Sequence, residues 1–240
     1  MAEQRFTAFA QGRASGQAQI DEGLRSFMLK VYNYMGLGLA LTGAVAFFVS
    51  TSPALMQAIF GTPLQWLVML SPFAFILVLS FGINRLRPAT AQLLFWAFAG
   101  VMGLSLSSIF IVYTGTSVAR VFFITASVFG AMSLYGYTTK KSLASWGSFL
   151  FMGLIGILIA MVVNIFLASS ALHFIISVVG VLIFTGLTAY DTQQIKHQYY
   201  EGDTAVIAEK KAIMGALRLY LDFINLFIML MHLLGQNRCA

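Results

Sequence analysis

Two apolar stretches near the C-terminus each carry one aspartate: VLIFTGLTAYDTQQIKHQYY at residues 181–200 and ALRLYLDFINLFIMLMHLL at residues 216–234. Asp191 closes the first apolar run, whereas Asp222 lies in the middle of the second. Acids are rare in this chain, because only 8 Asp and Glu occur among 240 residues. The solvent that surrounds these two carboxyl groups therefore decides the fold and the chemistry together.

The composition identifies that solvent as lipid. Hydrophobic residues make up 59% of the chain and charged residues only 9%, against about 25% charged residues in a soluble domain. The net charge of +6 does not indicate nucleic-acid binding, because the basic residues stand singly or in pairs between apolar runs. The single cysteine, Cys239, has no partner for a disulfide. We therefore predict an integral membrane protein whose first partner is the bilayer.

The chain divides into seven apolar segments, each near the roughly 20 residues that a membrane span needs. A polar region at 1–26 precedes them and lacks the apolar core of a signal peptide. We predict an all-α, polytopic bundle with a cytoplasmic tail at 1–26, a seven-helix domain at 27–234 and a short tail at 235–240. The predicted spans are 27–50, 64–83, 89–113, 117–138, 147–168, 171–190 and 212–234.

Lysine and arginine predict the orientation of these spans, because cytoplasmic connections carry an excess of both. Only Arg120 and Arg238 depart from an alternating pattern. We expect the N-terminus in the cytoplasm and the C-terminus on the far side. The residues that set this pattern are Arg5, Arg13, Arg25, Lys30, Arg85, Arg87, Lys140, Lys141, Lys196, Lys210 and Lys211.

Asp222 needs a partner, because an ionised aspartate at the centre of a span costs about 2.5 to 3.5 kcal/mol on insertion scales. Arg218 lies one helical turn earlier and is a local candidate. Asp191 is the second candidate, since adjacent antiparallel helices can bring the two carboxyl groups to one level. Arg85, at the end of the second span, is the third. All three belong to the same side of the membrane.

A pair of carboxyl groups in a poorly solvated site cannot ionise both members easily, so the two groups share one proton. Such a pair opens as the pH rises and the proton leaves. Carboxylate oxygens also attract hard cations such as Ca²⁺, so Asp191 and Asp222 are candidate transient ligands of a permeating ion. The residues therefore suggest a pH-gated cation path.

Three stretches carry a resemblance to a known family: TTKKSLASWGSFLFMGLIG at 138–156, TGLTAYDTQQIKHQY at 185–199 and LYLDFINLFIMLM at 219–231. They resemble the bacterial members of the Bax inhibitor family, the transmembrane Bax inhibitor motif proteins. The resemblance implies a seven-helix bundle in the bacterial inner membrane, with the last helix central and wrapped by the other six.

The resemblance also implies an activity, a pH-sensitive calcium leak without a cofactor. Asp191 and Asp222 would form a hydrogen-bonded latch, and an arginine at the end of the second helix would exchange with it. That arginine corresponds to Arg85, with Arg87 close by. Arg218 is a positive charge that many relatives lack, so it is a candidate modulator.

Other chemistries fit the residues less well. An intramembrane aspartyl protease would share the Tyr190-Asp191 pair, but its Gly-x-Gly-Asp run is missing before Asp222. A zinc hydrolase would need clustered histidines. His173 and His197 are about 36 Å apart on one helix, and His173 and His232 share the outer face. We predict no enzyme activity and no catalytic residue. The alternative function is a non-transporting regulator that binds other membrane proteins, such as proteases.

Overall fold

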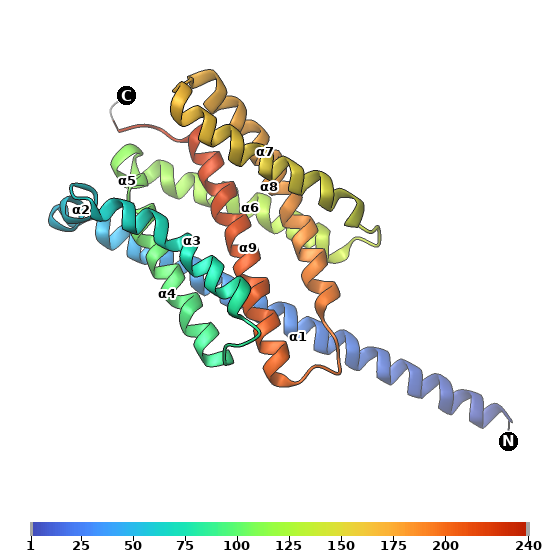
Figure 1. Cartoon of the computed structure of the whole chain (residues 1–240). Coiled ribbons are helices and arrows are strands. Elements are labelled where there is room, and N and C mark those ends of the chain that lie inside the picture. Colours follow the sequence, from blue (N-terminus) through green and yellow to red (C-terminus); the bar gives the residue numbers. More distant parts are fainter. Residues whose placement is uncertain (1, 239–240) are drawn as a thin grey trace.

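The computed structural model describes residues 2–238, with side chains from residue 21 onward (Figure 1). Seven helical segments in this range are long and apolar enough to cross a bilayer, with α4 and α5 together forming one of them. The prediction of an all-α membrane protein with seven spans is therefore confirmed. The helices are α1 (Ala2–Ser50), α2 (Pro53–Phe60), α3 (Leu64–Gly82), α4 (Pro88–Leu106), α5 (Ile109–Val112), α6 (Gly115–Thr138), α7 (Ala144–Leu167), α8 (Ser170–Gln198) and α9 (Ala205–Leu234).

The ends of the chain differ in detail from the predicted division. The predicted boundary between tail and first span falls inside α1, which is one continuous helix from Ala2 to Ser50. The short α2 in the first connection was not predicted, although Ser52 caps it and Pro53 occupies its first turn. Cys239 and Ala240 lie outside the described residues.

The last two helices extend beyond their apolar runs. α8 continues past Asp191 to Gln198, so the aspartate lies inside the helix. α9 begins at Ala205, seven residues before the predicted start at Ala212. The hydroxyl of Thr204 caps this helix by accepting a hydrogen bond from the backbone N–H of Ile207, which satisfies a donor that would otherwise have no partner.

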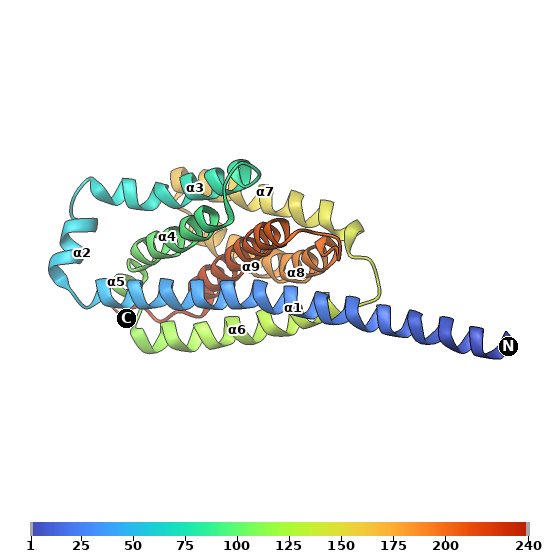
Figure 2. The ribbon, with the colours of Figure 1, turned by 90° about the horizontal axis from the view of Figure 1, so that it is seen from below.

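α9 is the core of the bundle. In its most apolar window 72% of the residues are buried, compared with 11–39% in the other six spans. α9 packs against α1, α4, α6 and α8, while α3 lies outside on α4 and α7 lies outside on α8 (Figure 2). The central position of the last helix is thus confirmed, although four helices rather than six form its main contacts.

One stripe of α9 escapes this burial. Between Ala212 and His232 every residue that is not buried lies on this stripe, with spacings of three or four that place its members on a single helical face. In Figure 1, α9 runs between the α3–α4 pair and the α7–α8 pair. The stripe is the less completely covered side of α9, with Arg218 exposed and the other members partly buried. We call it the open face of α9: Met214, Arg218, Leu221, Asn225, Ile228 and His232.

A close contact between backbones fixes α6 against α8. A Cβ atom on Gly136 of α6 would lie 2.2 Å from the carbonyl oxygen of Ala189, which no small adjustment can relieve. Ala189 is two residues from Asp191. Because Gly136 has no side chain, α8 can pack close against α6, and this contact helps to fix the position of Asp191.

We expect Gly136→Ala to destabilise the protein by about 1 to 3 kcal/mol, because the added methyl group overpacks the α6–α8 contact. Gly130→Ala on the same helix is the matched control, since no atom lies within 4 Å of the added Cβ. Thermal unfolding in detergent measures both variants. Equal melting temperatures for the two variants would contradict this account of the contact.

The orientation of the bundle in the membrane is a further prediction. The α3–α4, α6–α7 and α8–α9 connections lie at one end of the bundle, where the N-terminal half of α1 also emerges (Figure 1). Because these connections carry most of the basic residues, we expect this end in the cytoplasm. Topology reporters fused after Lys141 and after Cys239 should then report opposite sides of the membrane. The same side for both fusions would refute the assignment.

Candidate functional site

A cavity of about 580 Å³ lies between α7, α8 and α9. Asp191 of α8 and Asp222 and Arg218 of α9 are the charged residues that line it, and Asn225 adds an amide group one turn further along α9. The rest of the lining is mostly apolar or aromatic. The structure therefore brings together three of the five residues that the sequence singled out.

Asp222 is the only charged side chain that is buried among the residues whose side chains are described, with 6% of its surface exposed. Its Oδ2 atom is buried and receives no hydrogen bond from any donor in that part of the chain. The half-buried carboxyl group of Asp191 lies within hydrogen-bonding reach of the Asp222 carboxyl group. A carboxylate has no hydrogen to donate, so only a proton held between the two groups would complete this contact.

The cation nearest to the pair is Arg218 and not Arg85. Arg218 is exposed and lines the cavity one turn before Asp222. Arg85 and Arg87 are exposed in the α3–α4 connection, outside the cavity lining. Arg218 acts on the carboxyl groups through space, because the ion pairs in the described part of the chain involve only Glu22, Asp203 and Glu209 among the acids.

The segment after Asp191 is anchored to other helices by buried polar side chains. Thr192 shares a hydrogen bond of 3.0 Å with Ser133 of α6, which in turn contacts the hydroxyl of Tyr32 on α1. Gln193 accepts a hydrogen bond from the backbone N–H of Leu143 and donates one to the carbonyl oxygen of Lys141. These contacts fix the height and rotation of α8, and therefore the position of the Asp191 carboxyl group.

The backbone of α7 comes close to α8 beside the cavity. A Cβ atom on Gly147 would lie 2.6 Å from the ring of Tyr190, so this glycine lets α7 approach α8 next to Asp191. This close contact between α7 and α8 narrows the cavity next to the carboxyl pair. The polar residues of α9 still line the cavity.

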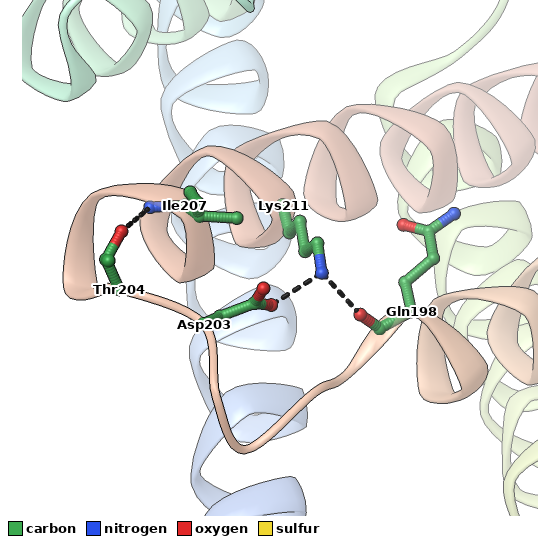
Figure 3. Close-up of polar contacts among 5 residues, drawn as sticks. All are labelled: Gln198, Asp203, Thr204, Ile207 and Lys211. Atoms are coloured by element: carbon green, nitrogen blue, oxygen red, sulfur yellow. Dashed lines mark hydrogen bonds and ion pairs between the residues drawn. The ribbon is translucent and has the colours of Figure 1, made fainter.

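A lysine clamp joins the end of α8 to the start of α9 (Figure 3). The ammonium group of Lys211 donates to the carbonyl oxygen of Gln198 at 2.9 Å and to the carboxylate of Asp203 at 2.5 Å. Thr204, next in the chain, caps α9. Because Lys211 is itself on α9, the clamp sets how far α9 slides along α8, and so the level of Asp222 relative to Asp191.

Sequence reasoning missed a second cluster at this end of α9. Glu209 falls between the predicted spans 171–190 and 212–234, but it lies in the second turn of α9, where Lys30 and the hydroxyl of Tyr34 both donate to its carboxylate. This cluster ties α9 to α1. The signal that would have found it is Thr204, because a helix that starts at this cap includes Glu209.

The histidines fall into two places. The rings of His173 and His232 lie 4.5 Å apart between centroids at the end of the bundle opposite the basic connections, whereas His197 is near the other end of α8. Among the described residues, no three His, Cys, Asp or Glu side chains converge in a way that could hold a metal ion. For a hard cation such as Ca²⁺ the best oxygen ligands are those of Asp191 and Asp222, and their role as transient ligands stays a prediction.

Comparison with known proteins gives a consistent result. The family described as "Inhibitor of apoptosis-promoting Bax1" matches residues 24–239. A protein of Rickettsia prowazekii is 51% identical over 218 residues, covering 91% of this chain and 92% of the relative. A protein of Caulobacter vibrioides is 48% identical over 230 residues, covering 91% and 92%. The inner membrane protein YbhL of Escherichia coli is 44% identical over 229 residues, covering 94% and 98%.

We expect Lys211→Gln to loosen the α8–α9 connection, because it removes two hydrogen bonds from a charged donor, each worth about 1.5 to 3 kcal/mol. Amide hydrogen exchange over residues 199–204 should become faster, as measured by mass spectrometry. Lys210→Gln is the matched control, since its ammonium group contacts Asn84 in the α3–α4 connection instead. Similar exchange of this segment in both variants would show that the clamp does not hold it.

Proposed function

Because the chain belongs to the Bax inhibitor family of membrane proteins, we propose that it is a pH-dependent cation leak gated by Asp191 and Asp222. One observation carries the proposal. Two carboxyl groups from adjacent helices line one open cavity between α7, α8 and α9, and one of them is buried without a hydrogen-bond donor in the described part of the chain. A carboxyl pair in such a place titrates as one unit.

At low pH the pair holds one proton, and a hydrogen bond between the two carboxyl groups ties α8 to α9. When the proton leaves, two negative charges face each other. At a separation of about 4 Å and an effective dielectric constant of about 20, they repel by about 4 kcal/mol. A repulsion of this size is sufficient to separate the two side chains and open the cavity between the helices.

Arg218 is the group best placed to compensate the released charge. It lies on the open face of α9 and lines the same cavity, one helical turn from Asp222. A positive charge there favours the ionised pair, so it lowers the pH at which the gate opens. Arg85 would need a rearrangement of the α3–α4 connection to take the same role.

The permeating cation would be the substrate, and Ca²⁺ is the ion whose ligand preference fits best. Ca²⁺ binds six to eight oxygen atoms at variable geometry. The ionised pair offers four carboxylate oxygens, and Asn225 supplies an amide oxygen beside them. A site of this kind is open and incomplete, so water would complete the coordination and the ion would not be retained.

We place this activity in the bacterial inner membrane, a location supported by the name of the Escherichia coli relative. We expect the N-terminus in the cytoplasm because of the basic connections. A regulator that binds other membrane proteins without transport is the second candidate. Its docking surfaces would be the basic connections. Ion flux separates the two functions, because the regulator needs none.

We expect purified protein in liposomes that contain a calcium dye to leak Ca²⁺ slowly at low pH and faster as the pH rises. Asp222→Asn and Asp191→Asn should each abolish most of this pH dependence, because the amide keeps the side-chain volume but removes the titration. The double variant should add little, since both residues act on one coupled unit.

Glu201→Gln is the matched control for these variants, since Glu201 is an exposed acid in the α8–α9 connection. It should leak with the wild-type pH profile. A wild-type profile for both single aspartate variants would refute the gate. A complete absence of flux from the folded wild-type protein would favour the regulator.

A second prediction distinguishes the two arginines. Arg218→Gln should shift the midpoint of the leak to higher pH, because the ionised pair loses a favourable charge. Arg85→Gln should shift it less, since Arg85 lies outside the cavity. The calcium flux assay, repeated across pH, measures both midpoints. A larger shift for Arg85→Gln would mean that Arg85 reaches the pair in the open state.

A further inference from the structure

Another cavity in the bundle lies at the opposite end of the same three helices. It has a volume of about 200 Å³ and is lined by residues of α7, α8 and α9. His173 in the first turns of α8 and His232 in the last turn of α9 meet there, with 4.5 Å between their ring centroids. His232 is ten residues beyond Asp222, about 15 Å along α9, so this cavity is separate from the carboxyl pair.

The two imidazoles have no protein partner that explains their position. Neither ring forms a hydrogen bond or an ion pair within the part of the chain whose side chains are described. An imidazole always has a ring nitrogen that can bind a proton or a metal, and two rings at this distance can direct one nitrogen each to a shared ion.

Thioether side chains line the same cavity as the two imidazoles. Met229 lies one turn before His232 on α9, is 3% exposed and lines the same cavity. Its sulfur packs against Gly180 of α8, where a Cβ atom would lie 2.7 Å from Sδ. Met161 of α7 is a second thioether at the rim. The amide oxygen of Asn164 at the same cavity accepts one hydrogen bond, from the backbone N–H of Ser169.

We propose that His173, His232 and Met229 form a binding site for a soft monovalent metal ion, with Cu(I) as the best match. Thioether sulfur selects Cu(I), and imidazole nitrogen also suits copper. No carboxylate lines this cavity, so Ca²⁺ and Mg²⁺ lack the charged oxygen ligands that they prefer. Zn²⁺ prefers four ligands from Cys, His and carboxylate, of which this site has two.

A metal ion at this site would join the start of α8 to the end of α9. The ligands come from two helices, so the bound ion fixes their separation at this end of the bundle. Binding to the folded state alone also raises the free energy of unfolding, by an amount set by the ion concentration relative to its dissociation constant. The site thus has a readout in stability that does not depend on ion flux.

The test uses the full chain in detergent with the Cys239→Ser change, which removes the only thiol. Cu(I) is supplied under anaerobic, reducing conditions and competes with a chromophoric Cu(I) chelator. We expect one Cu(I) per chain and a higher melting temperature with the metal. His173→Asn and His232→Asn should each abolish binding. Met229→Leu should weaken it at least about tenfold, since even partners of metal ligands cost about 10- to 100-fold in affinity when mutated.

His197→Asn is the matched control, because this third histidine lies far from the cavity on α8, and it should keep the full affinity. Metal-free melting temperatures close to that of the parent protein establish that each variant folds. Retention of Cu(I) by both His173→Asn and His232→Asn would overturn the site, as would an absence of Cu(I) binding by the parent protein. Tighter binding of Zn²⁺ than of Cu(I) would overturn the assignment of the metal.

Discussion

A carboxylate within the membrane must face the interior of the protein, because the bundle is surrounded by lipid. In this protein the helix in that interior is α9. Four neighbouring helices bury most of its surface. Asp222 is therefore shielded from the hydrocarbon, but also from bulk water. The same burial leaves one face of α9 less completely covered. Polar residues are concentrated beside that face. Because the bilayer excludes charge, both the cavity of the carboxyl pair and the cavity of the two histidines lie there.

Of the three helices that line the two cavities, α7 is held by the fewest contacts. α8 is anchored beyond Asp191 by Thr192 and Gln193, and α9 is tied to α1 through Glu209. α7 packs mainly on α8, and only 11% of its apolar window is buried. It lines both cavities, so a shift of α7 against lipid changes their volume, and the hydrogen bond between Gln193 and Leu143 at the start of α7 limits that shift at one end.

The spans could be predicted from the sequence, because hydropathy acts locally along the chain, and so could the need of Asp222 for a partner in lipid, with Arg218, Asp191 and Arg85 as the candidates. The identity of the nearby cation could not. Arg218 lies one turn before Asp222 and Arg85 ends the second span, so both were candidates, and only the cavity between α7, α8 and α9 shows which one lies beside the pair. The start of α9 was missed for a different reason, since a single cap at Thr204 extends a helix through residues that are polar in composition.

A core that is encoded last has a consequence for biosynthesis. During translation the six earlier spans enter the membrane before the helix that they are to enclose has been made, and at about 5 to 20 residues per second the final 30-residue helix follows only seconds later. Until then only the sides of α1, α4, α6 and α8 that will contact α9 have no partner, since α1 also packs on α4 and α6 on α8. The bundle can therefore complete its packing only after the last span has been made. A chain that is truncated before residue 205 lacks α9, the helix around which the others pack.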